Sequence, residues 1–171
     1  MRQLILFRHA KAEGRSASGD DFDRQLTQKG EADARLIGQV LHEAGLDPDL
    51  ALVSAAMRTR QTWEAAAAAF PGSPEVRHEA GLYNASSAWL RQSVESLEGH
   101  GGVVMFVGHN PGMHQLALDL LVESGAAASL IARAGSRFPP ATAAVFAMDA
   151  AGRPTYDGLF YAADFGGGAG D

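Results

Sequence analysis

Two short segments place basic and imidazole side chains in a pattern that suits chemistry on an anion. Arg8 and His9 follow an apolar run at residues 4–7, and His109 follows a second apolar run at residues 103–107. Arginine offers forked N–H donors that match phosphate oxygens, and a neutral imidazole has a lone pair that can attack phosphorus. We interpret Arg8 as a phosphate ligand, His9 as the nucleophile, and His109 as a donor to a phosphoryl oxygen.

A second arginine, Arg58, is expected at the same site. It falls in the opening turns of a helix that follows a short apolar run at residues 50–53. Helix starts carry partial positive charge and free N–H groups, so an arginine there reinforces an anion site. Arg60, two positions later, is interpreted as a solvated helix residue.

Taken singly, these residues have simpler interpretations. An Arg-His pair after a strand is often a solvated loop, and a lone histidine such as His109 is often a capping or core residue. The repetition of the same strand-to-histidine junction at two places favours the functional interpretation.

The elements that must position these side chains alternate between strand and helix, which is typical of an α/β fold. The uninterrupted apolar runs predict strands buried on both faces, as in a parallel sheet, whose carboxyl ends face the ligand crevice. Further strands are predicted at residues 50–53, 75–79, 142–148 and 155–161, the last as an antiparallel edge strand. Helices are predicted from the cap Thr27 to Gly45, after Ser54, near 87–97, after the cap Asn110 with Pro111 as first helical residue, and at 128–134.

The intervening polar stretch at residues 12–25 predicts a loop near the site. The composition of the 171-residue chain predicts one domain, residues 1–165, followed by a glycine-rich mobile tail at 166–171.

Composition also excludes several functional classes. The absence of cysteine excludes disulfides, thiolate catalysis and zinc–thiolate sites. The net charge of −6 argues against nucleic-acid binding. No apolar run approaches the ~20 residues that cross a bilayer, and the amino terminus lacks a signal-peptide pattern, so we expect a cytoplasmic location without membrane contact. The spacing of His109 and His114 does not match a zinc helix, and neither a metal nor a cofactor is predicted.

Three segments together resemble the histidine phosphatase superfamily. The run Arg8-His9-Ala10 is similar to its Arg-His-Gly signature, with Ala10 in place of glycine. Residues 54–62 resemble its second-arginine segment, and residues 108–111 resemble its second-histidine segment. The short length, the run from Asp23 to Thr27 with Gly30, and Gly-His-Asn-Pro most resemble the small SixA-type phosphohistidine phosphatases.

The resemblance implies a three-layer α/β/α sandwich with a mostly parallel central sheet. It implies that His9 becomes phosphorylated, that Arg8, Arg58 and His109 hold the phosphoryl group, and that water then releases phosphate without a metal. Asn110, the residue after His109, is a further candidate for substrate binding. Glu79 lies where related enzymes often carry an acidic residue, and it is the candidate general acid, with a surface salt bridge as the alternative.

The expected substrate is a phosphorylated protein, because phosphohistidine has a stable leaving group that needs little acid help and the short chain leaves the site open. Two other functions stay open. The chain could be a phosphomonoesterase or mutase for a small phosphorylated metabolite, for which Lys11, Arg15 and Arg24 are the extra cations nearby. It could also be a non-catalytic module that binds a phosphorylated partner. The sequence does not determine the oligomeric state or the partner.

Overall fold

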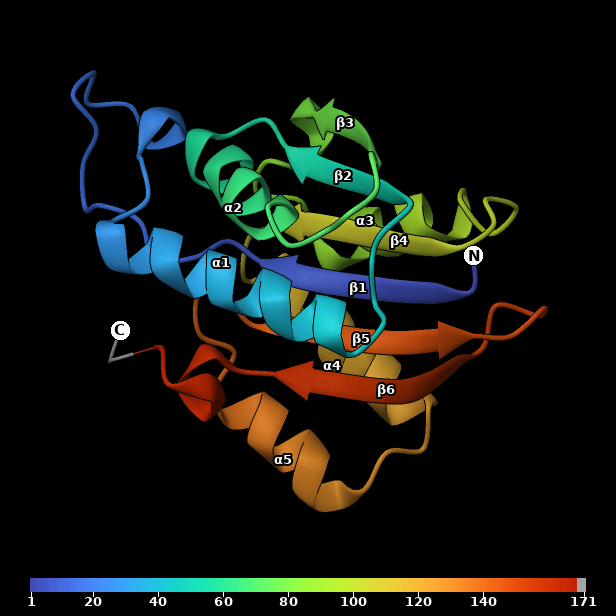
Figure 1. Ribbon diagram of the computed structural model, residues 1–171. Coiled ribbons are helices and arrows are strands. Elements are labelled where there is room, and N and C mark those ends of the chain that lie inside the picture. Colours follow the sequence, from blue (N-terminus) through green and yellow to red (C-terminus); the bar gives the residue numbers. More distant parts are fainter. Residues whose placement is uncertain (169–171) are drawn as a thin grey trace.

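The protein folds around one six-stranded mixed sheet with helices on both faces, as seen in a computed structural model that describes residues 1–168 (Figure 1). The strand order is β3-β2-β4-β1-β5-β6. The strands are β1 (Gln3–Arg8), β2 (Leu50–Ser54), β3 (Glu75–Glu79), β4 (Val103–Gly108), β5 (Ala143–Met148) and β6 (Pro154–Phe160). The predicted α/β class is confirmed.

Three of the five strand pairings are parallel and two are antiparallel. β1 and β2 both pair in parallel with β4, and β2 pairs in parallel with β3. β5 runs antiparallel to β1, and β6 runs antiparallel to β5. The carboxyl ends of β1, β2 and β4 therefore meet at one edge of the sheet, toward the blue loop in Figure 1.

The helices divide between the two faces of the sheet. They are α1 (Gln28–Glu43), α2 (Met57–Ala67), α3 (Ser87–Glu95), α4 (Gly112–Glu123) and α5 (Ala128–Ser136), with single turns η1 (Asp21–Asp23), η2 (Ala80–Leu82) and η3 (Ala162–Phe165). Successive side chains of a strand point to opposite faces, so β1 contributes to two cores. Leu4 and Leu6 pack with residues of α3, α4 and α5, whereas Ile5 and Phe7 pack with residues of α1 and α2.

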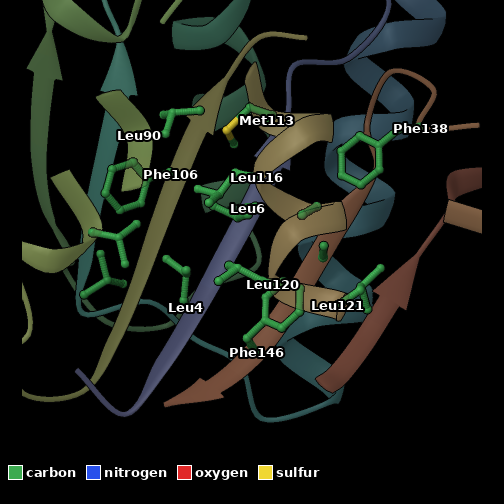
Figure 2. Packing of buried hydrophobic residues seen from close by; sticks show 14 of the residues in the cluster. Leu4, Leu6, Leu90, Phe106, Met113, Leu116, Leu120, Leu121, Phe138 and Phe146 are labelled. Atoms are coloured by element: carbon green, nitrogen blue, oxygen red, sulfur yellow. The ribbon is translucent and has the colours of Figure 1, made fainter. Parts of the chain in front are cut away.

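One of the two cores lies under α4. Figure 2 shows Leu4, Leu6, Phe106 and Phe146 from three adjacent strands beneath the apolar face of this helix. These side chains are fully buried, so the strands are held at fixed positions by close packing. The polar residues of the candidate site follow at the ends of these strands.

Of two helix caps predicted from the sequence, one is confirmed and one is wrong. Thr27 caps α1 as predicted, because its hydroxyl accepts a hydrogen bond from the Gly30 amide at 2.9 Å. The prediction that Asn110 caps the later helix is wrong. Pro111 is the cap residue, α4 begins at Gly112, and the Asn110 side-chain amide instead donates to the Phe138 carbonyl at 3.1 Å.

The first residues of the predicted tail form specific contacts. The Gly167 amide donates to the Ala162 carbonyl, and the Gly168 amide donates to Asp33 Oδ1, both at 3.0 Å. This start of the tail is therefore hydrogen-bonded to the fold, in contrast to the expected loose chain. The remainder of the predicted tail lies outside the described residues.

Candidate active site

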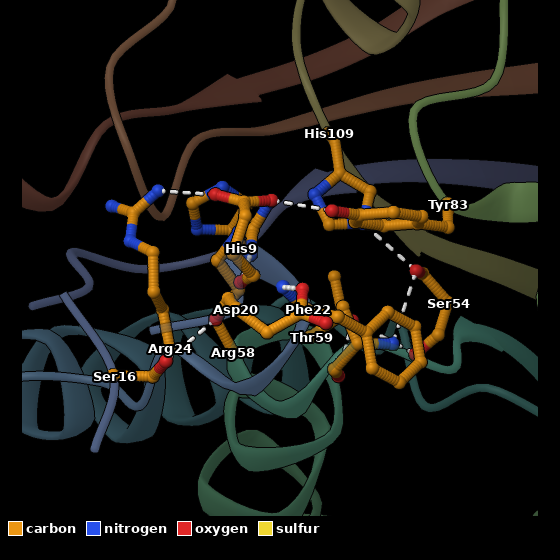
Figure 3. Close-up of polar contacts among 12 residues, drawn as sticks. His9, Ser16, Asp20, Phe22, Arg24, Ser54, Arg58, Thr59, Tyr83 and His109 are labelled. Carbon is orange, nitrogen blue, oxygen red and sulfur yellow. Dashed lines mark hydrogen bonds and ion pairs between the residues drawn. The ribbon is translucent and has the colours of Figure 1, made fainter. Parts of the chain in front are cut away.

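The candidate site lies at the carboxyl ends of β1, β2 and β4. His9 follows the last residue of β1, and its backbone is held on both sides. Its amide donates to the Gly108 carbonyl at 3.0 Å, and its carbonyl accepts from the Ala141 amide at 3.1 Å. The parallel pairing of Arg8 with Gly108 places His109 directly beside His9. Figure 3 shows His9, His109, Ser54 and Tyr83 gathered at this edge.

The tautomer of His9 is fixed by its backbone neighbour. Nδ1 of His9 lies 2.7 Å from the Ala10 carbonyl oxygen. A carbonyl oxygen only accepts hydrogen bonds, so Nδ1 carries the proton and Nε2 keeps its lone pair. The Ala10 amide donates to Thr62 Oγ1 at 3.0 Å, and the same hydroxyl donates to the Arg58 carbonyl at 2.7 Å. The His9 ring is thereby tied to the helix that carries Arg58.

The residue at position 10 fits as alanine. Its side chain is fully buried in the core on the α1 and α2 side, which accommodates the methyl group that glycine lacks.

The second imidazole, His109, is buried against the first. The ring centroids of His9 and His109 are 5.3 Å apart. His109 Nε2 lies 2.8 Å from Ser54 Oγ at the end of β2, and the Tyr83 ring meets the His109 ring edge-on at 5.5 Å. Within residues 1–168, the buried Nδ1 atom of His109 has no hydrogen-bond partner. A buried polar atom without a partner is costly, so this atom is available to a ligand.

Both imidazoles are held neutral. Burial lowers the pKa of His9 from 6.5 to about 3, and His109, Arg58 and Arg8 act in the same direction. Burial likewise lowers the pKa of His109 from 6.5 to about 4, with the charges of Arg58 and Arg8 adding to the effect. A neutral His9 with a free lone pair on Nε2 is the form of imidazole that can attack phosphorus.

The two predicted arginines lie at the imidazole pair. Arg58 is the second residue of α2 and is only 5% exposed, although it is charged. Arg8 donates from a terminal guanidinium nitrogen to the Phe138 carbonyl at 2.8 Å. Both charges act on the pKa of His9 and of His109, so the two guanidinium groups and the two imidazoles lie close to one another. Arg60 is exposed, as expected for a solvated helix residue.

A carboxylate from the loop after β1 lies on Arg58. One terminal nitrogen of Arg58 donates to the Asp21 carbonyl at 2.8 Å, and the other donates to Asp21 Oδ2 at 3.1 Å. The Tyr83 hydroxyl donates to the same carboxylate oxygen at 2.5 Å, and Arg24 donates to Oδ1 at 2.9 Å. The hydrogen bond from Tyr83, together with those from Arg24 and Arg58, holds the pKa of Asp21 well below its usual range.

Asn110 and Glu79 have different surroundings. The buried Oδ1 atom of Asn110 has no hydrogen-bond partner in the described chain, and its Nδ2 bonds to the same carbonyl as Arg8, that of Phe138. Glu79 ends β3 and pairs in parallel register with Ser54. Paired residues of parallel strands have side chains on the same face, so Glu79 lies beside the serine that contacts His109. Within residues 1–168 its carboxylate makes no ion pair or hydrogen bond, so the alternative of a surface salt bridge is not seen there.

Several site residues were missed by the sequence interpretation. Ser54 and Thr62 were included in the second-arginine segment, but neither was given a role in the site. Asp21 was placed in a loop near the site without a role, and Tyr83 was not singled out. A polar residue at the end of β2 is a signal that could have identified Ser54, because that strand ends at the same edge as β1. Among the described residues, no group of three or more His, Cys, Asp or Glu side chains is placed to hold a metal ion, and no helix is long and apolar enough to cross a bilayer.

Comparison with known families gives a match over more than half of the chain. A profile of the histidine phosphatase superfamily (branch 1) matches residues 4–98. An uncharacterized chloroplastic protein of Arabidopsis thaliana is 35% identical over 138 residues, which cover 75% of this chain and 62% of that protein. The chain thus spans less than two thirds of the length of this plant relative.

Solved structures give the same architecture. A protein of Agrobacterium tumefaciens, provisionally named phosphohistidine phosphatase SixA, superposes with a TM-score of 0.78 at 32% identity, covering 94% of this chain and 97% of that one. A protein histidine phosphatase SixA solved in complex with tungstate also has a TM-score of 0.78, at 20% identity, covering 95% and 99% of the two chains. The second comparison bears on the fold alone.

Proposed function

Because the chain belongs to the histidine phosphatase superfamily, we propose that it hydrolyses phosphohistidine in a protein through a covalent intermediate on His9. The observation that carries this proposal is the imidazole pair with its ring centroids 5.3 Å apart, in which the Nδ1 proton of His9 is held by a main-chain carbonyl. A nucleophile with a fixed tautomer, two arginines and a second histidine supply what phosphoryl transfer requires, namely positioning and charge stabilisation.

In the first step, the lone pair on Nε2 of His9 attacks phosphorus. The bond from phosphorus to the substrate nitrogen breaks, and its electron pair goes to that nitrogen. Arg8 and Arg58 hold the equatorial oxygens of the phosphoryl group, and Asn110 contacts the phosphoryl group beside them. We assign the Ser54 hydroxyl, 2.8 Å from Nε2 of His109, as the donor in that contact, so that the ring carries its proton on the buried and unpartnered Nδ1 and can donate it to a phosphoryl oxygen.

In the second step, water attacks the phosphorus of phospho-His9. The P–N bond breaks, the electron pair returns to Nε2, and inorganic phosphate leaves. His9 regains its starting form without a net proton transfer, because Nδ1 keeps its proton on the Ala10 carbonyl throughout. We assign Glu79 as the general acid or base that moves the proton of the water or of an alkoxide leaving group.

Trapping the intermediate tests the proposal. The protein is incubated with N-phosphoimidazole, quenched at alkaline pH and searched for acid-labile phosphate on His9. We expect labelling of the wild type, none in His9→Ala, and strongly reduced labelling in Arg58→Ala. Arg60→Ala is the matched control, since it is an exposed arginine on the same helix and should label normally.

The alternatives make different predictions. A phosphomonoesterase or mutase would turn over a sugar phosphate faster than a phosphohistidine protein. A non-catalytic binding module would show no label on His9 in any variant. The first result would change the substrate class, and the second would remove the proposed chemistry altogether.

A further inference from the structure

We propose that Asp21 is a specificity-determining residue that favours cleavage of P–N bonds over P–O bonds. The inference rests on the proposed function, and it concerns the group that leaves from phosphorus. Asp21 would accept a hydrogen bond from the second ring nitrogen of the phosphorylated imidazole of the substrate.

Asp21 is located on the solvent side of the phosphate-binding arginine. The Asp21 side chain is 47% exposed, whereas that of Arg58, to which it is bonded, is 6% exposed. The phosphoryl group must reach His9 and Arg58, so the remainder of the substrate lies outward from them. We therefore place the leaving group beside the carboxylate of Asp21, a residue that two hydrogen bonds keep on the arginine that would bind the phosphoryl group.

The carboxylate is rigidly held and has room for one more donor. Oδ2 already accepts from Arg58 and from the Tyr83 hydroxyl, whereas Oδ1 accepts only from Arg24. A carboxylate oxygen accepts two hydrogen bonds, so Oδ1 keeps one acceptor position. These three donors also keep the carboxyl ionised, so it can accept but cannot donate a proton.

This chemistry suits an imidazole leaving group. A phosphohistidine ring that carries a proton on its second nitrogen is cationic, and an adjacent carboxylate stabilises that form. When His9 attacks, the P–N bond breaks, its electron pair goes to the nitrogen that held phosphorus, and the ring leaves as neutral imidazole. No proton has to move in this step. Asp21 would thus hold the proton on the second nitrogen of the substrate ring, as the Ala10 carbonyl holds the Nδ1 proton of His9.

The same carboxylate opposes ester cleavage. A phosphate monoester carries two negative charges, and its leaving oxygen gains further negative charge as the bond breaks. A fixed carboxylate at the entrance repels this charge and has no proton to give. The ratio of the two activities, more than either rate alone, therefore measures the role of Asp21.

The test compares two small substrates in the full-length protein. Wild type and Asp21→Asn are assayed with N-phosphoimidazole and with 4-nitrophenyl phosphate. The amide keeps an acceptor oxygen for Arg58 and Tyr83 but loses the charge. We expect kcat/KM for N-phosphoimidazole to fall by about tenfold or more, and that for 4-nitrophenyl phosphate to stay level or rise. The alkaline limb of kcat for N-phosphoimidazole should also move to lower pH in the variant.

The control is Asp23→Asn, in the same helical turn. The Asp23 carboxylate accepts from Ser18 at 2.7 Å and not from Arg58 or Tyr83, so both activities should match the wild type. If Asp21→Asn raises or lowers kcat/KM for both substrates by the same factor, Asp21 acts only through Arg58, either by holding it in place or by blocking it. That result would overturn the inference. If the wild type hydrolyses neither substrate, the proposed function itself fails, which is a distinct result.

Discussion

Ser54 and His109, which are 55 positions apart in the chain, are joined by a hydrogen bond of 2.8 Å between Oγ and Nε2. Both atoms are buried, and each residue stands at the end of a different parallel strand. The contact makes the orientation of the His109 ring depend on a single hydroxyl. The proposed role of His109 as a phosphoryl donor therefore depends on Ser54.

We expect Ser54→Ala to slow the phosphorylation of His9 by about tenfold, because His109 loses the donor that keeps its proton on Nδ1. Rapid-quench labelling with N-phosphoimidazole measures this rate. Ser93→Ala is the control, since that hydroxyl bonds to the Trp89 carbonyl on the exposed side of α3. An unchanged rate in Ser54→Ala would contradict the role of this bond.

A second prediction concerns the link from Thr62 to the His9 loop. Thr62→Val leaves the amide of Ala10 buried without an acceptor, which should lower the free energy of unfolding by about 1–3 kcal/mol. The labelling rate should fall as well, because the Ala10 carbonyl holds the His9 tautomer. Thr62→Ser keeps the hydroxyl and should retain the labelling rate. Urea denaturation and labelling together check both parts, and equal behaviour of the two variants would refute the link.

A third prediction concerns the close approach of α1 to the His9 loop. A Cβ atom at Gly30 would lie 2.1 Å from the backbone oxygen of Lys11, which is too close for any side chain. We expect Gly30→Ala to destabilise the fold by about 1–3 kcal/mol and to lower the labelling of His9. Gly14→Ala, where nothing lies within 4 Å, should leave stability nearly unchanged. Thermal melts of the two variants give the comparison, and equal melting temperatures would count against it.

A fourth prediction follows from the lowered pKa of His109. The unfolded ring has a pKa of 6.5 and the folded ring about 4. Between these values the unfolded state binds more protons, so stability falls as pH decreases from 6.5 to 4, by up to about 1.4 kcal/mol per pH unit for one histidine. His109→Gln removes this contribution, and its unfolding free energy should depend less steeply on pH. Denaturation at several pH values tests this, and parallel curves for the two proteins would disprove it.

The sequence was informative where local chemistry and strand ends decide the structure. His9, Arg58 and His109 were assigned to one site because parallel strands end at a common edge, and the structure brings them together. Asp21 could not be assigned in the same way, because its polar loop has no periodicity and its contact with Arg58 joins segments 37 positions apart. The contact between Tyr83 and Asp21 spans 62 positions and is equally invisible in the sequence.

Two features of the fold depend on contacts between residues that are far apart in the chain. Asn110 has the residue type of a helix cap, yet its side-chain amide donates to the Phe138 carbonyl of a distant loop, and α4 begins at Gly112, one residue later than predicted. The direction of β5 was also undetermined, because an apolar run predicts a strand but not its partner. Its antiparallel pairing with β1 follows from the sheet as a whole.

Two main-chain hydrogen bonds, one to Gly108 and one from Ala141, hold the His9 backbone and limit how far its imidazole can move toward a substrate. An imidazole anchored in this way cannot travel outward, so the phosphorylated side chain must extend inward to meet it. On the proposed function, we expect a protein substrate to present its phosphorylated histidine on an exposed segment that can enter the site.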